Sequence, residues 1–293
     1  MKRCAIVLIL CGLLLGGCAP QGEYAQVAAT TGPVYHFTAE LCRGTGLTVA
    51  RLVTEEISCL HDYSLNVRQA KAAEAAEVIV ISGAGLEEFM EDILHHKQTI
   101  DASADIPLLT PTEHSHEADE AGHEDHHPDS DPHIWLSPLC ARQMVQNICA
   151  GLSRRYPQYK EVFAENAGAL TLQLEQLQRY GEQTLSTLAC RELITFHDGF
   201  AYFADSFDLT ILEAVEEESG REASAKELIH LIEEAEHHNL PAIFTEKNGS
   251  VSAASIIARE TGCGSFTLDM AMTGDSYFDA MYHNIDTIKE ALG

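Results

Sequence analysis

Four side chains in this sequence are candidate ligands for one transition metal, and two come from each half of the chain. Three are imidazoles and one is a carboxylate: His61, His133, His197 and Asp269. His197 and Asp269 each end a short apolar run, so we expect both at the carboxyl edge of a parallel sheet, where open α/β folds bind ligands. Three nitrogens and one oxygen suit tetrahedral Zn²⁺, with His nitrogen at roughly 2.0–2.1 Å.

The positions of these residues along the chain do not bring them together. They are separated by 72, 64 and 72 residues, so only the fold can make them converge. A lone His is more often a hydrogen-bonded structural residue than a ligand. The metal hypothesis therefore requires two lobes that meet at these four side chains.

The elements that would position them alternate between short apolar runs and longer amphipathic stretches. This alternation is typical of βαβ units, so we predict α/β lobes with parallel sheets flanked by helices. Ser224 and Glu227 have the spacing of a capping box before one predicted helix. The predicted strands are 27–31, 48–53, 78–82, 193–196, 210–214, 242–245 and 266–268, and the predicted helices are 67–77, 86–95, 224–238, 251–261 and 275–292.

One segment, from about residue 157 to 188, has helical spacing and no strand pattern. A helix of about 30 residues is roughly 45 Å long, which exceeds what one lobe needs. We interpret it as a rigid connector, with two shorter helices broken at Gly181 as the alternative. The predicted division is an N-terminal lobe at 26–156, the connecting helix at 157–188 and a C-terminal lobe at 189–293, with the metal between the lobes.

The N-terminus has the pattern of a bacterial lipoprotein signal. Lys2 and Arg3 precede an apolar run that is too short to span a bilayer. The sequence LGGC ending at Cys18 resembles a lipobox, so we predict a signal peptide at 1–17, acylated Cys18 as the bilayer anchor, and a tether at 18–25. An ordinary secretory signal is the alternative. The predicted location is extracytoplasmic, at the cell surface or in the periplasm.

Export makes disulfides feasible. Cys140 and Cys149 are expected on one helix, roughly 13 Å apart, which is beyond disulfide reach. Cys190 and Cys263 each precede a predicted strand at the same sheet edge and form the candidate bridge. The alternative is that all six remaining thiols are free: Cys42, Cys59, Cys140, Cys149, Cys190 and Cys263.

Charge and composition limit the classes of partner that the protein can bind. The formal net charge of −27 argues against nucleic-acid binding, and 45% hydrophobic residues exclude wholesale disorder. Residues 113–129 hold five His and seven acidic residues, which predicts a surface loop that binds metal weakly. A solvated acidic loop is the alternative. The loop histidines are His114, His116, His123, His126 and His127.

Six short segments carry a family resemblance from about residue 26 to the C-terminus: HDYSL, GAGLEEFM, DPHIWLSP, FHDGFAYF, FTE and TLD. In this order they resemble the zinc/manganese solute-binding receptors of bacterial ABC transporters, and DPHIWLSP is a specific motif. The resemblance implies two α/β lobes joined by one long helix, with the metal between them. It also implies delivery of that metal to a membrane permease. We expect a monomer.

The resemblance also assigns roles to residues. His61, His133 and His197 match the three imidazole positions of the family. Manganese members tend to carry a carboxylate at the third position, so His197 favours Zn²⁺ over Mn²⁺. Some zinc members have Glu directly before HDY, where this chain has Leu60. The fourth ligand is therefore expected to be Asp269, with Glu246 or water as alternatives. The His-rich loop resembles that of the zinc-importing branch.

Two other function classes compete with a receptor. A zinc hydrolase would keep an open coordination position for water and use Glu246 as a base. The chain has no HExxH, GxSxG or phosphate-binding glycine motif, so we predict that it is not an enzyme. A surface adhesin is the other alternative, because lipid-tethered receptors face outward.

Overall fold

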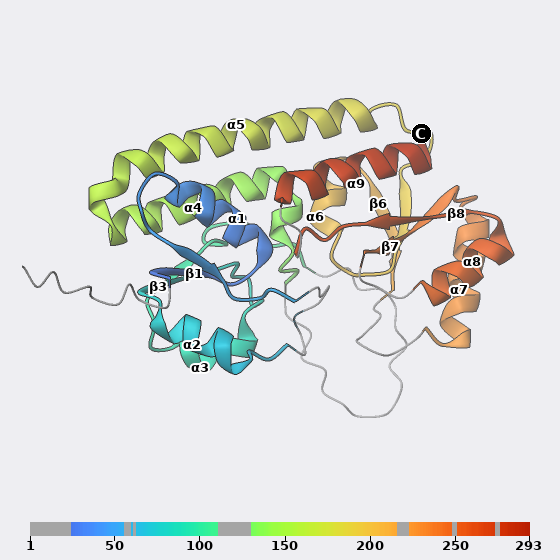
Figure 1. The fold of residues 1–293 in the computed structure, drawn as a ribbon. Helices are drawn as coiled ribbons and strands as arrows, with labels where there is room; N and C mark the ends of the chain where they lie inside the picture. Colours follow the sequence, from blue (N-terminus) through green and yellow to red (C-terminus); the bar gives the residue numbers. More distant parts are fainter. Residues whose placement is uncertain are drawn as a thin grey trace, which may run out of the picture.

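The structure, a computed structural model, describes residues 25–55, 60, 63–110, 130–215, 223–247, 251–272 and 276–293. Within these ranges the chain forms two α/β lobes, and a long helix extends across both (Figure 1). The predicted signal peptide with Cys18, the predicted ligand His61 and the His-rich loop lie outside the described residues.

The two sheets share one topology, which places their binding edges in equivalent positions. The N-terminal sheet has the order β2-β1-β3-β4 and the C-terminal sheet the order β6-β5-β7-β8, and all pairings are parallel. The chain reverses its direction of winding between β1 and β3 and between β5 and β7, which are the usual ligand positions of such sheets. The strands are β1 (Val27–Ala29), β2 (Val49–Arg51), β3 (Val78–Ile81), β4 (Thr99–Asp101), β5 (Glu192–Thr195), β6 (Thr210–Ala214), β7 (Ala242–Glu246) and β8 (Gly264–Leu268).

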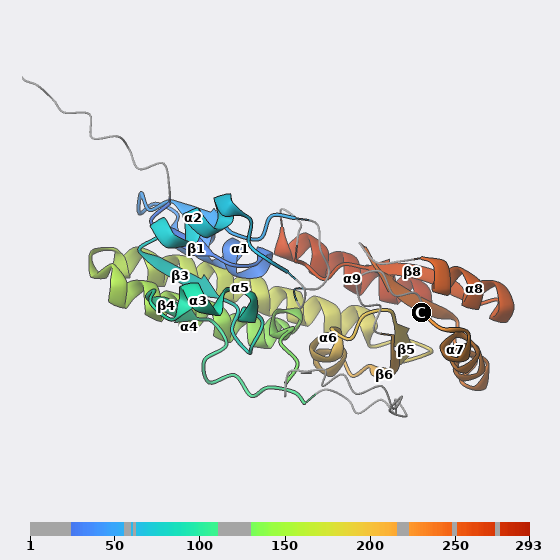
Figure 2. The ribbon, with the colours of Figure 1, turned by 90° about the horizontal axis from the view of Figure 1, so that it is seen from below.

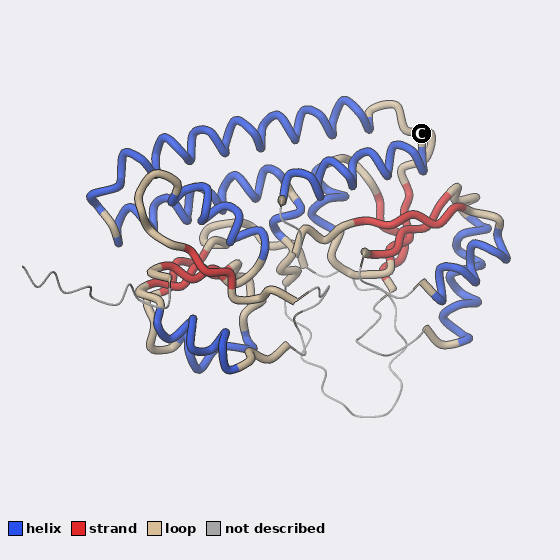
Figure 3. Tube along the Cα trace, in the orientation of Figure 1, coloured by secondary structure: helices blue, strands red, loops and turns tan. Residues whose placement is uncertain are grey.

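Helices cover both faces of each sheet (Figures 2 and 3). On the outer faces, α2 and α3 pack on the N-terminal sheet, and α7 and α8 pack on the C-terminal sheet. On the other side, α1, α4, α5, α6 and α9 contribute to one hydrophobic core that continues through both lobes. The helices are α1 (Gly32–Cys42), α2 (Val67–Ala75), α3 (Glu91–Leu94), α4 (Pro138–Arg155), α5 (Lys160–Leu185), α6 (Ala201–Ser206), α7 (Ala225–His237), α8 (Ser252–Thr261) and α9 (Tyr277–Leu292), with short 3-10 turns at Glu88–Met90, Ile134–Leu136 and Pro157–Tyr159.

The long helix is continuous, so the fold prediction is confirmed and the alternative break at Gly181 is wrong. Helix α5 packs along α4, α1 and α9, and its buried face includes Phe163, Leu170 and Leu174. The glycine at position 181 lets α5 pack closely against Phe207, because a Cβ there would lie 2.2 Å from Cε1 of that ring. The residue boundaries of the lobes remain a prediction.

Other details of the sequence prediction need correction. Strand β4 was missed because its three residues contain a single apolar side chain, that of Ile100, and helix α1 was missed as well. Cys190 and Cys263 are free thiols, so the candidate bridge is not formed.

Cys140 and Cys149 do share one helix, α4. The capping box at Ser224 and Glu227 is present. No helix in the described part of the chain is long and apolar enough to cross a membrane.

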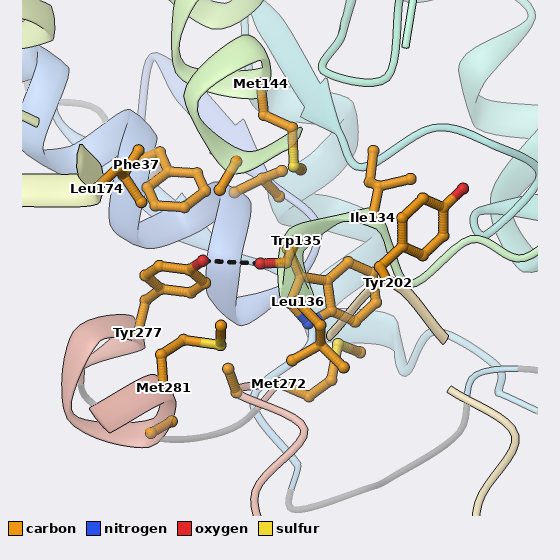
Figure 4. Packing of buried hydrophobic residues seen from close by; sticks show 14 of the residues in the cluster. Phe37, Ile134, Trp135, Leu136, Met144, Leu174, Tyr202, Met272, Tyr277 and Met281 are labelled. Atoms are coloured by element: carbon orange, nitrogen blue, oxygen red, sulfur yellow. Dashed lines mark hydrogen bonds between the residues drawn. The ribbon is translucent and has the colours of Figure 1, made fainter. Parts of the chain in front are cut away.

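Buried contacts tie the lobes together around Trp135 (Figure 4). Its indole Nε1 donates to the Met270 carbonyl at 2.8 Å, and Tyr277 Oη donates to the Trp135 carbonyl at 2.7 Å. Arg51, on the N-terminal sheet, donates from Nη2 to the Met272 carbonyl at 2.6 Å. Because these bonds and the shared core cross the boundary, the lobes have little freedom for a wide hinge motion.

Two glycines on α5 test this packing. Gly181→Ala forces a methyl group into buried Phe207, whereas a Cβ at Gly168 meets nothing within 4 Å. Both substitutions gain the same helix propensity. We therefore expect Gly181→Ala to be less stable than Gly168→Ala by about 1–3 kcal/mol in urea unfolding. Equal stabilities would contradict the close packing of α5 on the C-terminal lobe.

Candidate metal centre

His133 is positioned by the acidic residue two places before it. The Asp131 carboxylate accepts from the His133 backbone N–H at 2.8 Å and contacts the ring Nδ1 at 2.7 Å, both through Oδ1. The other oxygen, Oδ2, is buried without a hydrogen-bond partner among the described residues. Tyr202 of α6 donates its hydroxyl to the Asp131 carbonyl at 3.2 Å. We infer that the proton of the His133 ring is on Nδ1, so that Nε2 carries a lone pair.

His197 directly follows Phe196 at the end of β5, as the sequence analysis expected. The Thr195 hydroxyl donates to the His197 carbonyl at 3.1 Å, and Phe196 N–H donates to the Phe244 carbonyl on β7 at 2.9 Å. Gly199 makes room for the ring, since a Cβ there would lie 2.6 Å from His197 Cδ2 and 2.6 Å from Met270 Cε. The backbone thus holds the imidazole at the point where the sheet reverses its winding.

The two imidazoles meet between the lobes with their Nε2 atoms facing each other. The Nε2–Nε2 distance is 3.3 Å, and the rings lie edge to face at 88°. Two nitrogens bound to one tetrahedral Zn²⁺ at 2.0–2.1 Å would be roughly 3.3–3.4 Å apart. The described pair therefore has the separation that tetrahedral zinc requires of two ligands.

Glu246 lies on the other side of the His197 ring. It is the last residue of β7, is 6% exposed, and places Oε2 3.6 Å from Nδ1 of His197. Each imidazole therefore presents Nε2 to the other lobe and has a buried carboxylate near Nδ1. Carboxylates commonly orient metal-binding histidines through the second ring nitrogen. Asp131 is at hydrogen-bond distance from His133 Nδ1, whereas Glu246 lies 3.6 Å from His197 Nδ1.

Asp269 directly follows β8. It is 8% exposed, Oδ1 accepts from the Ala271 N–H at 2.8 Å, and Oδ2 lies 3.1 Å from Nζ of Lys247. The next residue, Met270, packs at Gly199 beside His197 and accepts from the indole of Trp135. The structure thus brings His133 and His197 together and places Glu246 beside His197. Asp269 precedes Met270, the residue that packs at Gly199 and accepts from Trp135.

Part of the predicted ligand set lies among the described residues. His61 and the loop histidines are outside the described residues, and among those that are described no group of three or more His, Cys, Asp or Glu is arranged as a metal site. The chain just after His61 is well anchored: Tyr63 Oη donates to Glu55 Oε2 at 2.6 Å, which lowers the pKa of that carboxyl to about 2.

Sequence reasoning missed the ring-orienting position of Asp131 and considered Glu246 only as a ligand or a base. The sequence did contain a pattern that indicates this position of Asp131. The spacing Asp-x-His lets the carboxylate reach both the backbone and the ring of the same histidine. Glu246 required knowledge that β5 and β7 are neighbours, which the paired residues Thr195 and Phe244 establish.

Comparison with known proteins agrees with this geometry. Residues 27–291 match the family described as "Zinc-uptake complex component A periplasmic". The chain belongs to this family.

Individual members resemble the chain over nearly its whole length. It is 29% identical to the zinc-binding lipoprotein AdcA of Streptococcus pneumoniae strain R6 over 99% of this chain and 61% of that protein. The high-affinity zinc uptake system protein ZnuA of Bacillus subtilis is 26% identical over 100% of this chain and 96% of the relative. A crystal structure of ZnuA has a TM-score of 0.79 at 27% identity, covering 92% of this chain and 100% of that one.

The N-terminal sheet has a buried carboxyl group at the equivalent edge. Glu87 accepts from Thr30 Oγ1 at 2.6 Å and from the backbone N–H groups of Ser82 and Gly83 at 2.7 and 3.0 Å. It joins the loop after β3 to the end of β1. Burial raises its pKa to about 7, against the effect of these donors.

This pKa predicts a pH-dependent stability. Because the folded pKa of Glu87 exceeds its ordinary value of 4.5, its stabilising contribution is complete below about pH 4.5 and is lost as pH rises through about 7. Relative to Glu87→Gln, the wild type should lose up to about 3 kcal/mol of unfolding free energy over that range. Urea unfolding at several pH values measures the difference, and a difference independent of pH would contradict the shift.

Proposed function

We propose that this chain is an extracytoplasmic receptor that captures Zn²⁺ between its lobes and delivers it to the permease of an ABC importer. The observation that carries the proposal is the His133–His197 pair, whose facing Nε2 atoms have the spacing of two tetrahedral zinc ligands. His61 is proposed as the third ligand and Asp269 as the fourth. Membership of the zinc-uptake family supports this assignment.

The donor set favours zinc over manganese. Imidazole nitrogen suits Zn²⁺, whereas carboxylate-rich sites suit Mn²⁺. The two relatives compared above are named for zinc, and neither name describes an enzyme. A receptor needs only to bind and release its cargo, and the carboxylates Asp131 and Glu246 then serve to orient imidazoles.

Capture would involve small movements. The core and the hydrogen bonds at Trp135 restrain the lobes, so side chains and nearby loops would close around the ion. Protons compete with metal for imidazole nitrogen, so zinc affinity should fall steeply below about pH 6. Acylation of Cys18 would hold the receptor near its permease. Residues 113–129 would collect zinc weakly and pass it to the main site.

The central test removes one imidazole at a time. His61→Ala, His133→Ala and His197→Ala should each abolish binding of one tight zinc equivalent, because each removes a ligand that water replaces poorly. Isothermal titration with Zn²⁺ and metal analysis measure the loss.

Matched controls separate this site from surface histidines and from the loop. His95→Ala removes an imidazole whose side chain is 71% exposed and should leave tight binding unchanged. Deletion of residues 113–129 should lower the total zinc bound and keep the tight equivalent. Tight binding that survives His197→Ala and disappears with the loop would overturn the proposed interlobe site.

The orienting carboxylates give a second prediction. Asp131→Asn and Glu246→Gln keep the size of each side chain and remove its charge, so each should weaken zinc binding about 10- to 100-fold while one equivalent still binds. Competition with a zinc chelator measures the affinity. Asp208→Asn, at a side chain that is 96% exposed, is the control for net charge. Wild-type affinity in both orienting variants would show that the rings need no carboxylate.

A further inference from the structure

Lys247 lies beside Asp269 because of the register of two parallel strands. Glu246 on β7 pairs with Leu268 on β8, so the residues that follow them, Lys247 and Asp269, leave the sheet next to each other. The backbone N–H of Lys247 also donates to the Leu268 carbonyl at 2.9 Å. The contact between Nζ and Oδ2, at 3.1 Å, therefore starts from fixed backbone positions.

The two partners differ greatly in exposure. The side chain of Asp269 is 12% exposed and that of Lys247 is 56% exposed. A carboxylate that is largely removed from water needs compensation by a nearby charge or by hydrogen bonds. The ammonium group, by contrast, can return to water at small cost, since exposed ion pairs contribute little free energy.

Every other polar group of Asp269 is held in place. Its backbone N–H donates to Asn284 Oδ1 at 2.7 Å, and its carbonyl accepts from Asn284 Nδ2 at 2.8 Å. Oδ1 accepts from the Ala271 N–H. Among the contacts of the described residues, the one at Oδ2 is therefore the contact most easily exchanged.

We propose that Lys247 is a built-in counter-cation, which neutralises Asp269 in the metal-free protein and is displaced from Oδ2 when Zn²⁺ binds. This inference rests on the proposed function, in which Asp269 is the fourth ligand. Lys247 lowers the zinc affinity, because the ion must replace an existing partner of the carboxylate. In return, it stabilises the metal-free receptor and favours release of the ion.

The test compares two substitutions at position 247. Lys247→Met removes the charge and retains most of the length of the side chain, and Lys247→Arg keeps the charge. We expect Lys247→Met to raise zinc affinity about two- to fivefold and Lys247→Arg to leave it within about twofold of wild type. Zn²⁺ affinity is measured on the full chain by competition with a chelating indicator. The metal-free melting temperature should fall by about 1–3 °C in Lys247→Met.

A double-mutant cycle distinguishes the contact from a general electrostatic effect. In an Asp269→Asn background, Lys247→Met should change neither zinc affinity nor metal-free stability, because the partner is already neutral. Lys160→Met, at the far end of α5, controls for net charge and should resemble wild type (Figure 1). An increase in affinity of the same size with and without Asp269 would overturn the proposal.

The remaining outcomes separate this inference from the proposed function. If wild type binds one tight zinc and Lys247→Met leaves its affinity unchanged or lowers it, the counter-cation role is wrong and the receptor function stands. If wild type binds no tight zinc, both are wrong. Unchanged affinity in Asp269→Asn alone would remove Asp269 from the ligand set and overturn this inference, while His133 and His197 would remain.

Discussion

The contact between His133 and His197 is the constraint on which the candidate centre depends. Two imidazoles from different lobes meet at 3.3 Å, and both rings are largely buried. The position of the lobes, the interlobe hydrogen bonds and the buried carboxylates all maintain this one contact.

The interlobe core maintains it by limiting movement. Trp135 is two residues from His133 and donates a hydrogen bond to Met270, which packs beside His197, so the same segments carry the candidate metal ligands and the lobe contacts. Any displacement of one lobe would disturb the hydrogen bond between Trp135 and Met270 together with the contact between the two imidazole rings. Because the lobes cannot move apart without disturbing these contacts, the histidine pair can be preformed in a structure whose long helix α5 is continuous across both lobes.

Much of the fold followed from the sequence, because seven of the eight strands overlap short runs that the sequence predicts as strands. Strand β4 lacks such a run, and its place in the sheet comes from pairing with β3. The convergence of His133 and His197 could not be established from the residues alone, since 64 positions separate them. Residue types and positions raised it as a hypothesis, which the family resemblance then supported. Two further positions depend on strand order and register, which hydrophobic patterns do not specify. They are the position of Glu246 beside His197 and that of Lys247 beside Asp269.

The two sheets share one topology, but different residues occupy the equivalent edge in each lobe. At the edge between β1 and β3, Glu87 occupies the ligand position and uses the hydroxyl of Thr30 and the amides of Ser82 and Gly83. His133, the candidate ligand that the structure describes in the N-terminal lobe, comes from a segment outside the sheet. Between β5 and β7 the same position holds His197 and Glu246. One topology thus positions a hydrogen-bond network in one lobe and a candidate metal ligand in the other.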